Sequence, residues 1–494
     1  MDRLSYDSLT KIGYKGFLLK DGPEKVLQFG EGNFLRAFTD CFVDLMNEKA
    51  GFNGKVAVVS PRGSVKHCDE INEQDGLYTL LIRGQEDGVR IDKKRVISCI
   101  SRCINPNSEY EAFLECAHNP DLRFIFSNTT EAGIVYDPAC SFTDKPASSF
   151  PGKLTQLLYE RFKKDLPGFI ILSCELIDRN GDKLKKCVTD YIKQWELPDD
   201  FAAWVGEENI FCSTLVDRIV PGYPKDSAEK ICEELGYEDT LLDAGEVYAS
   251  WVIEGPESIK EEFPVDKAGL PITFTDNVDA YKKRKVRILN GAHTAMVAAA
   301  YLAGKDIVRD CMKDDVIRGY MNRALYDEII PVLKGLDEKG LHDFADAVTD
   351  RFENPFIDHK LLSIALNCTS KWKARVMPSL LEYYELKREL PAVLTFSFAA
   401  YLSFYRNGRE LEDGALIGSR NGQVYHIHDD EWVLKKFLKL KDEDEEVFTE
   451  TIIGDERMWE DSLKKLPGFK EAVLSDLKLI EEKGMYEAMR MIQA

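Results

Sequence analysis

VLQFGEGNFLRAF, from Val26 to Phe38, is the stretch that decides the fold. The apolar run Val26 to Phe29 predicts a buried strand, and Gly30 and Gly32 predict a turn directly after it. Apolar residues then recur at helical spacing as far as Met46, which predicts a helix. Strand, glycine turn and helix is the setting that a dinucleotide-binding fingerprint requires, because glycines let a pyrophosphate approach the helix N-terminus.

The match to that fingerprint is partial. Leu35 occupies the position of the third glycine, and a bare Gly-x-Gly before a helix is also common as a tight turn. The candidate cofactor-binding residues of this stretch are Phe29, Gly30, Glu31, Gly32, Asn33, Phe34, Leu35 and Arg36.

Strands and helices alternate along the following chain. Strands are predicted at Lys55 to Val59, Arg123 to Ser127 and Gly168 to Ile177, and helices at Phe150 to Lys164 and Asp182 to Trp195. This alternation predicts an α/β fold with a Rossmann-like doubly wound sheet.

Polar residues follow the strand Arg123 to Ser127. Since ligands lie beyond the carboxyl ends of parallel strands, Asn128 and Thr130 are placed to line a cofactor cleft, although the same residues could cap the next segment. No acid occurs between Gly51 and Cys68 to meet a ribose hydroxyl, and Arg62 could meet a 2′-phosphate. The choice between NAD and NADP stays open on this feature.

A second domain is expected after the last strands. Leu77 to Arg83 and Val89 to Ile91 predict a hairpin inserted into the sheet around Gly84 to Gly88, and Val247 to Ile253 and Ile272 to Thr275 predict the final strands. Helical patterns dominate beyond Tyr281. We therefore expect a sheet domain over residues 1–278 and a mainly α-helical domain over residues 279–494.

The composition narrows the class of protein. The 494 residues are 44% hydrophobic and carry a net charge of −21, a field that repels phosphate backbones, so nucleic acid is not an expected partner. No apolar run is long enough to cross a membrane.

The first residues lack a secretory signal and the twelve cysteines are scattered, which indicates reduced thiols in a cytoplasm. Cys99 with Cys103, and Cys116 with His118, lack a second pair at ligand spacing, so no metal is expected.

A second polar motif opens the helical half. On an α-helix with Lys285 at zero, Asn290 falls near 140° and His293 near 80°, so all three share one hemisphere. Gly291 costs a helix interior roughly 1 kcal/mol relative to alanine, which suggests a close approach to that backbone. A lysine, an amide and an imidazole together suit proton transfer and a developing negative charge on oxygen, although they could also form a solvated helix face.

Five motifs in the same order resemble the mannitol dehydrogenase family of metal-independent polyol dehydrogenases. They are QFGEGNFLRAF (Gln28 to Phe38), FSNTTEAG (Phe126 to Gly133), SCELIDRNGD (Ser173 to Asp182), STLVDRIVPGYP (Ser213 to Pro224) and KVRILNGAHTA (Lys285 to Ala295). The resemblance covers nearly the whole chain. It implies NAD as cofactor, a sheet domain with a helical C-terminal domain, and a monomer.

The resemblance also implies roles for individual residues. Lys285 would be the general acid and base, with Asn290 and His293 polarising the reacting oxygen. Leu176 stands where polyol members carry a second oxyanion-stabilising asparagine, so Asn290 would act alone or with help from Asn180.

The substrate-binding region is implied at Arg351 to Arg375. Lys371 fits the family lysine, whereas Ser363 stands at the family arginine position. His359, Lys360 and Arg375 are further candidates for binding a substrate carboxylate.

The resemblance implies an NAD-dependent oxidoreductase that interconverts tagaturonate and altronate in galacturonate breakdown. The alternatives are reduction of fructuronate to mannonate, or a neutral polyol as substrate. An alternative of another class is a catalytically inactive nucleotide-binding sensor.

Overall fold

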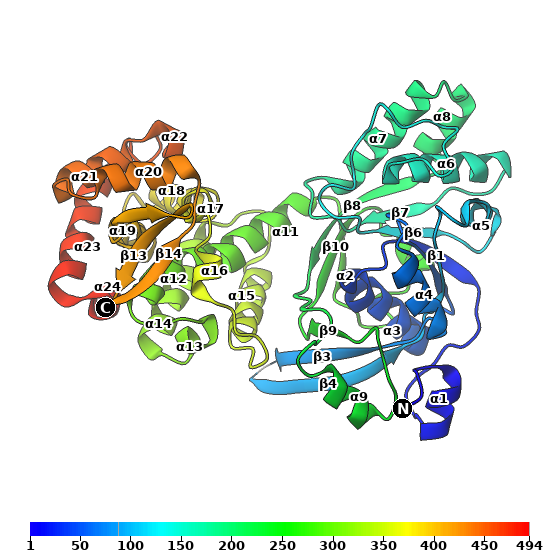
Figure 1. Ribbon diagram of the computed structural model, residues 1–494. Helices are drawn as coiled ribbons and strands as arrows, with labels where there is room; N and C mark the ends of the chain where they lie inside the picture. The colour runs from blue at the N-terminus through cyan, green and yellow to red at the C-terminus, as the bar shows by residue number, and fades with distance from the viewer. Residues whose placement is uncertain (87, 494) are drawn as a thin grey trace. The chain divides into compact units, whose positions relative to one another are not determined.

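The structure, a computed structural model, describes residues 1–86 and 88–493. The chain divides into two compact units. The N-terminal unit comprises residues 1–84 and 90–278, and the C-terminal unit comprises residues 85–89 and 279–494. Figure 1 traces the elements of both units along the chain.

The N-terminal unit is built on an eight-stranded sheet with the order β11-β10-β8-β7-β6-β1-β2-β5. Figure 1 labels β10, β8, β7, β6 and β1 of this sheet. The strands are β1 (Glu24–Phe29), β2 (Lys55–Val59), β5 (Ile100–Ile104), β6 (Phe124–Ser127), β7 (Ile170–Ser173), β8 (Ile210–Asp217), β10 (Ser250–Glu254) and β11 (Ile272–Thr275). Neighbours from β5 to β8 are parallel. The order of these six strands is the Rossmann order, in which the topology switches between β1 and β6.

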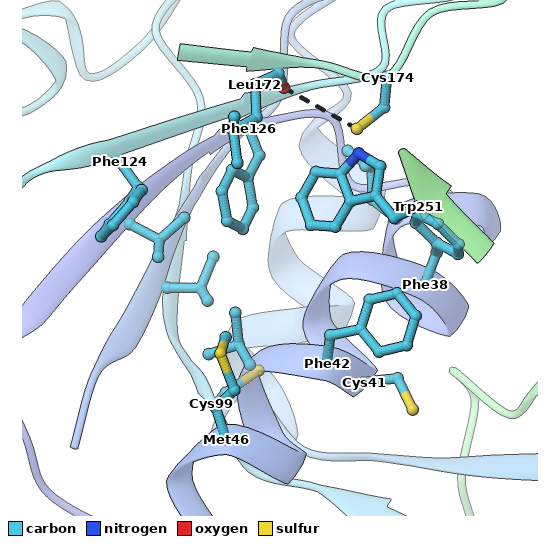
Figure 2. Close-up of a cluster of buried hydrophobic side chains, with 14 of the residues drawn as sticks. Phe38, Cys41, Phe42, Met46, Cys99, Phe124, Phe126, Leu172, Cys174 and Trp251 are labelled. Carbon is cyan, nitrogen blue, oxygen red and sulfur yellow. Dashed lines mark hydrogen bonds between the residues drawn. The ribbon is translucent and has the colours of Figure 1, made fainter. Parts of the chain in front are cut away.

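The strands send alternate side chains into two separate cores, because the side-chain period of a strand is two. Phe124 and Phe126 of β6 lie in one core, and Ile125 lies in the other. Figure 2 shows the first core, where Trp251 of β10 packs against Phe126 and Phe38 with ring centroids 5.5 Å and 5.6 Å away.

Helices cover both faces of this sheet. The first core is covered by α2 (Asn33–Leu35), η1 (Arg36–Asp40), α3 (Cys41–Ala50), α4 (Val65–Glu73) and α10 (Ile259–Glu262). The second is covered by α5 (Tyr110–Glu115), η2 (Cys116–His118), α6 (Phe150–Lys163), α7 (Asn180–Gln194) and α8 (Asp199–Glu207). Buried apolar side chains on both faces confirm the predicted doubly wound α/β fold.

The predicted hairpin forms, but its predicted insertion into the main sheet is wrong. It consists of β3 (Tyr78–Glu86) and β4 (Val89–Ile97), and β3 pairs in parallel with β9 (Asp243–Glu246) in a separate three-stranded sheet. Asp87, inside the predicted turn, lies outside the described residues. The two remaining helices of this unit are α1 (Tyr6–Ile12) and α9 (Ala228–Leu235).

The C-terminal unit is mainly helical, as predicted. After α11 (Val278–Arg284), its helices are η3 (Lys285–Asn290), α12 (Gly291–Leu302), α13 (Val308–Met312), α14 (Asp315–Arg323), η4 (Ala324–Ile329), η5 (Ile330–Val332), α15 (Glu338–Phe352), α16 (Leu361–Ile364), α17 (Cys368–Arg375), α18 (Met377–Lys387), α19 (Ala392–Arg406), α20 (Glu431–Leu440), α21 (Glu445–Ile453), α22 (Glu456–Trp459), α23 (Phe469–Lys483) and α24 (Met485–Ile492). Helix α12 is buried almost all round and packs against α19.

The sequence patterns did not predict a small antiparallel sheet in this unit. It consists of β12 (Glu410–Glu412), β13 (Ala415–Arg420) and β14 (Gln423–Ile427). Within residues 1–86 and 88–493, no helix combines the length and apolarity that crossing a membrane requires. All twelve cysteines are buried free thiols.

Candidate functional site

The turn after β1 requires glycine for two different reasons. Gly30 has φ +132°, and a Cβ there would lie 2.9 Å from Leu35 Cδ1 and 3.1 Å from the Asn128 carbonyl oxygen, so no side chain fits. A Cβ at Gly32 would meet nothing within 4 Å. Gly32 therefore leaves open space at the start of the helical run Asn33 to Ala50, where backbone N–H groups favour an anion.

Three other predicted residues of this turn, Phe29, Leu35 and Arg36, have side chains that are engaged within the protein. Phe29 and Leu35 are buried in the two cores, so a ligand could meet their backbone but not their side chains. Arg36 donates from Nη1 to the Leu241 carbonyl and from Nη2 to Asn33 Oδ1, each at 2.6 Å. These bonds hold the first helical turn in place.

Beyond the carboxyl ends of the strands lies a largely apolar cavity of about 420 Å³, lined by Phe34, Asn128, Thr130, Glu131, Ala132, Leu176 and Val216. It contains the predicted Asn128 and Thr130. Asn128 Nδ2 donates to the Cys174 carbonyl at 2.9 Å, and Thr130 has φ +72° and accepts from Arg62 Nη2 at 3.3 Å. The polar turn after β6 thus borders a ligand-sized space.

Glu175 organises that turn, a role that the sequence patterns did not predict. Its buried carboxylate accepts from Ser127 Oγ, from the Thr129 backbone N–H and from Thr129 Oγ1, all at 3.0 Å. Burial raises the pKa of Glu175, and these hydrogen bonds partly offset the increase. A glutamate directly after a buried strand was visible in the sequence, but its partners on the neighbouring strand were not.

Asn180 is a structural residue rather than a second oxyanion donor. Its Nδ2 donates to the carbonyls of Ser173, Glu175 and Thr214, and its Oδ1 accepts from the backbone N–H groups of Gly181 and Thr214. The side chain is buried and its hydrogen-bonding capacity is filled. Asn180 cannot replace the asparagine that is missing at Leu176, whose side chain is 65% exposed.

The motif around Lys285 adopts a different helix type from the α-helix predicted. Residues Lys285–Asn290 form a π-helix, and α12 starts at Gly291. A π-turn pairs residues i and i+5, so Lys285 and Asn290, five apart, are neighbours on one face rather than 140° apart. His293 then follows Asn290 at α-helical i+3 spacing, which keeps it on that face. Single π-turns inside α-helices are frequent at functional sites.

The close approach expected at Gly291 is observed. A Cβ there would lie 3.2 Å from the Arg375 carbonyl oxygen at the end of α17. Arg375 Nη1 also lies 3.4 Å from Thr294 Oγ1. The absence of a side chain at Gly291 thus lets the end of α17 lie against the start of α12.

His293 is held by stacking and keeps a nitrogen unused. Its ring lies 3.8 Å from that of Phe352 at an interplanar angle of 11°. Its Nε2 is buried and has no hydrogen-bond partner among the described residues. Burial, followed by the charges of His359, Arg351, Arg375 and Lys371, lowers the pKa of His293 well below its ordinary value. The imidazole is therefore neutral at neutral pH.

The predicted substrate-binding residues separate into two groups. His359 meets His293 edge to face at 5.4 Å, and Lys371 donates to the Ile364 carbonyl at 2.9 Å. Burial and neighbouring positive charge lower the pKa of His359 and of Lys371. Lys360, by contrast, is exposed, and its backbone pairs with Ile307. Positive charge around His293 at neutral pH therefore comes from Arg351, Arg375 and Lys371.

Two family models match the chain. The mannitol dehydrogenase Rossmann domain matches residues 24–267 and the mannitol dehydrogenase C-terminal domain matches residues 277–481. An altronate oxidoreductase of Escherichia coli is 46% identical over 479 residues, which cover 95% of this chain and 96% of the relative.

Two solved structures share the fold. A D-sorbitol dehydrogenase in substrate-free form has a TM-score of 0.81 at 24% identity, covering 96% of each chain. The ternary complex of Pseudomonas fluorescens mannitol 2-dehydrogenase with NAD and D-mannitol has a TM-score of 0.67 at 21% identity, covering 99% of each chain. With both of its domains matched and a relative at 46% identity over nearly its whole length, the chain belongs to the mannitol dehydrogenase family.

Proposed function

We propose that this protein is an NAD-dependent altronate oxidoreductase, which reduces tagaturonate to altronate and catalyses the reverse oxidation. The observation that carries the proposal is the 46% identity to the Escherichia coli altronate oxidoreductase over 95% of this chain. The proposed setting is galacturonate breakdown.

The N-terminal unit has the features that a dinucleotide needs. Gly32 has no obstructing neighbour, the helical run begins at Asn33, and the cavity beside Phe34 lies past the ends of β6, β7 and β8. Bound NAD would supply or accept the hydride. The residues that we expect to hold it are Phe29, Gly30, Glu31, Gly32, Asn33, Phe34, Leu35, Arg36, Asn128 and Thr130.

The C-terminal unit has the groups that a ketone reduction requires. Negative charge grows on the carbonyl oxygen as the carbon is reduced, and preformed donors stabilise it. We assign these donors to the Asn290 amide and to the neutral His293 imidazole, whose Nε2 has no partner among the described residues. Lys285 would give its proton to that oxygen in reduction and recover a proton from the hydroxyl in oxidation.

A substrate carboxylate accounts for the positive charge around His293. Arg375 and Lys371 are half-buried, and burial is the largest cause of the lowered pKa of each. Half-buried cations close together are unfavourable unless an anion joins them. We assign the carboxylate to Arg375 and Lys371, with His359 beside them. Exposed Lys360 has the weakest support among the candidates.

The test is a substrate panel with purified enzyme and NADH or NADPH. Tagaturonate should give the highest kcat/KM, with fructuronate and fructose at least tenfold lower. A preference for fructuronate would instead make the protein a mannonate oxidoreductase, and a preference for fructose would make it a polyol dehydrogenase. The absence of turnover with every substrate would favour a nucleotide-binding sensor.

The carboxylate assignment has its own test. Arg375→Met should raise the KM for tagaturonate at least tenfold while leaving the weak turnover of the uncharged ketose tagatose nearly unchanged. Lys360→Met is the matched control and should leave the KM for tagaturonate within about twofold. Equal losses with both ketoses would contradict the assignment.

Location and assembly complete the proposal. Twelve buried free thiols support a reducing compartment such as the cytoplasm. We further propose that the enzyme works as a monomer, which light scattering at micromolar concentration would test.

A further inference from the structure

The end of β2 lacks the acid that dinucleotide-binding sheets usually carry there. In such folds an Asp or Glu at this place accepts a hydrogen bond from the 2′-hydroxyl of the adenosine ribose. Here Val59 is followed by Ser60, Pro61 and Arg62, and no acid occurs between Gly51 and Cys68. The end of β2 on its own would leave the ribose without a carboxylate partner.

The glycine turn brings a carboxylate to this place from another part of the chain. Glu31, between Gly30 and Gly32, accepts a hydrogen bond from Ser60 Oγ to its Oε1 at 3.0 Å. Ser60 Oγ in turn accepts from the Ser64 backbone N–H at 2.9 Å. The hydroxyl is thus fixed by α4, and its single proton goes to Glu31.

The Glu31 carboxylate is positioned and largely shielded from water. Its side chain is 12% exposed, and Oε1 lies 3.9 Å from Nδ1 of His67 on α4. The hydrogen bonds of the described residues occupy Oε1 and leave Oε2 without a protein donor. A ribose hydroxyl beside this turn would find an acceptor in Oε2.

From this geometry we propose that Glu31 replaces the missing β2 acid, binds the 2′-hydroxyl of the adenosine ribose and selects NAD over NADP. A carboxylate accepts a hydrogen bond from a hydroxyl but repels a 2′-phosphate, which is acceptor-only and doubly charged. The inference rests on the proposed function in that the dinucleotide is the cofactor of that reaction.

Arg62 is the competing determinant. An arginine after β2 accommodates the 2′-phosphate in NADP-dependent enzymes. Here Arg62 is exposed, and its Nη2 donates to Thr130 Oγ1 at 3.3 Å, in the turn after β6. That bond directs the guanidinium towards the turn after β6, whereas Glu31 is bonded to Ser60 at the end of β2.

The test measures binding without turnover. Dissociation constants of ADP-ribose and 2′-phospho-ADP-ribose are determined by calorimetry, and those of NADH and NADPH by fluorescence, for the wild type, Glu31→Gln, Arg62→Ala and the control Glu70→Gln on α4. The wild type should bind NADH at least 100-fold more tightly than NADPH. Glu31→Gln should reduce this ratio at least tenfold, mainly by weakening NADH and ADP-ribose, and Glu70→Gln should leave it within twofold.

Several outcomes would overturn the proposal. They are an unchanged ratio in Glu31→Gln, a wild-type preference for NADPH, or a ratio that changes in Arg62→Ala but not in Glu31→Gln. If Glu31→Gln fails to fold, Glu31→Asp keeps the charge, shortens the reach and should lower the ratio by a smaller factor. Because no keto acid is present, an enzyme that binds NADH but reduces no substrate would refute the proposed function and leave this test intact.

Discussion

Two clusters of buried polar groups, one in each unit, differ in how completely they are hydrogen-bonded. Around Asn180 in the N-terminal unit, every side-chain hydrogen-bonding group of that amide has a protein partner. Around His293 in the C-terminal unit, the imidazole Nε2 has none among the described residues, and the cations that contribute, after burial, to its lowered pKa include buried Arg351 and half-buried Arg375 and Lys371.

This difference distinguishes buried polar groups that stabilise the fold from those that are available to a ligand. A buried polar group without a partner costs roughly 1–3 kcal/mol, and a protein retains such a cost where a ligand removes it. We therefore expect the Asn180 amide to stabilise the strand ends, and we propose that the His293 imidazole meets a substrate. Four experiments test this distinction.

The largest effect is expected at Lys285. Lys285→Ala should reduce kcat by about 10³-fold or more, equivalent to about 4 kcal/mol, because no other group assigned to the reaction transfers the proton. NADH binding should be unchanged within about twofold. Lys282→Ala, on the preceding turn, serves as control and should keep kcat within about threefold. Near-normal kcat in Lys285→Ala would make Lys285 a structural residue.

His293 should rank second. His293→Ala removes one donor to the developing oxyanion, an effect usually worth about 10²–10³ in kcat. Its lowered pKa also predicts the direction in which the stability of the protein changes with pH. The folded protein holds the imidazole neutral, so stability is lost as pH falls below about 6.5, the unfolded value, where the unfolded chain takes up a proton. His293→Gln should therefore flatten the decline in stability between pH 7 and pH 5. A wild-type decline that is unaffected by this change would contradict a buried neutral histidine.

Replacing Asn180 or Asn290 by alanine should have opposite effects on stability and on kcat. Asn180→Ala removes a hydrogen bond from each of three carbonyls and two backbone N–H groups, so it should lower the free energy of unfolding by about 3 kcal/mol with little change in kcat. Asn290→Ala should do the reverse, lowering kcat at least 30-fold with a small change in melting temperature. Among the described residues, the Asn290 side chain makes no hydrogen bond. Calorimetry would measure the stability of both variants, and initial rates would measure their kcat. Similar changes in the two variants would contradict the distinction between a structural and a catalytic asparagine.

Much of the fold could be predicted because its signals are local. The turn Gly30 to Gly32 and the alternation of strands and helices predicted the doubly wound sheet, and the resemblance predicted the family, which is confirmed. The β12–β14 sheet was predictable in principle, since Asp413-Gly414 and Asn421-Gly422 are hairpin signals and all four residues have positive φ. Helical periodicity dominates the sequence on either side of these pairs and masks their signal.

The rest of the candidate site depends on contacts that a sequence pattern does not contain. The 100° rotation of an α-helix mispredicts a π-turn, because one extra residue in the turn changes which side chains share a face. Glu175 bonds to Ser127 and Thr129, and Asn180 bonds to Thr214, all of which are distant in the sequence. The structural roles of Glu175 and Asn180 therefore appear only in three dimensions. Glu31 is a further example, because its link to Ser60 crosses from one βα turn to the next.

The smallest expected effect concerns Asp40. This residue shows that a buried polar atom without a hydrogen-bond partner does not always mark a ligand site. Asp40 lies in η1, its Oδ2 accepts from Gln28 at 3.2 Å, and its buried Oδ1 has no partner among the described residues. Burial raises the pKa of Asp40 to about 7, so the carboxyl is partly protonated near neutral pH and its desolvation cost is thereby reduced.

The sign follows from the two protonation equilibria of Asp40. An aspartate titrates near 3.9 in the unfolded chain, so stability from Asp40 is complete below that pH and is lost as pH rises towards 7. Asp40→Asn cannot ionise, so between pH 5.5 and 6.5 its stability relative to the wild type should increase by about 1 kcal/mol. Asp243, whose pKa is also raised to about 7 by burial, remains in the variant and should keep part of the pH dependence. Urea unfolding at the two pH values measures the difference. A constant difference would mean that Asp40 is ionised throughout, and its unpaired oxygen would then need an unidentified partner, as His293 Nε2 does.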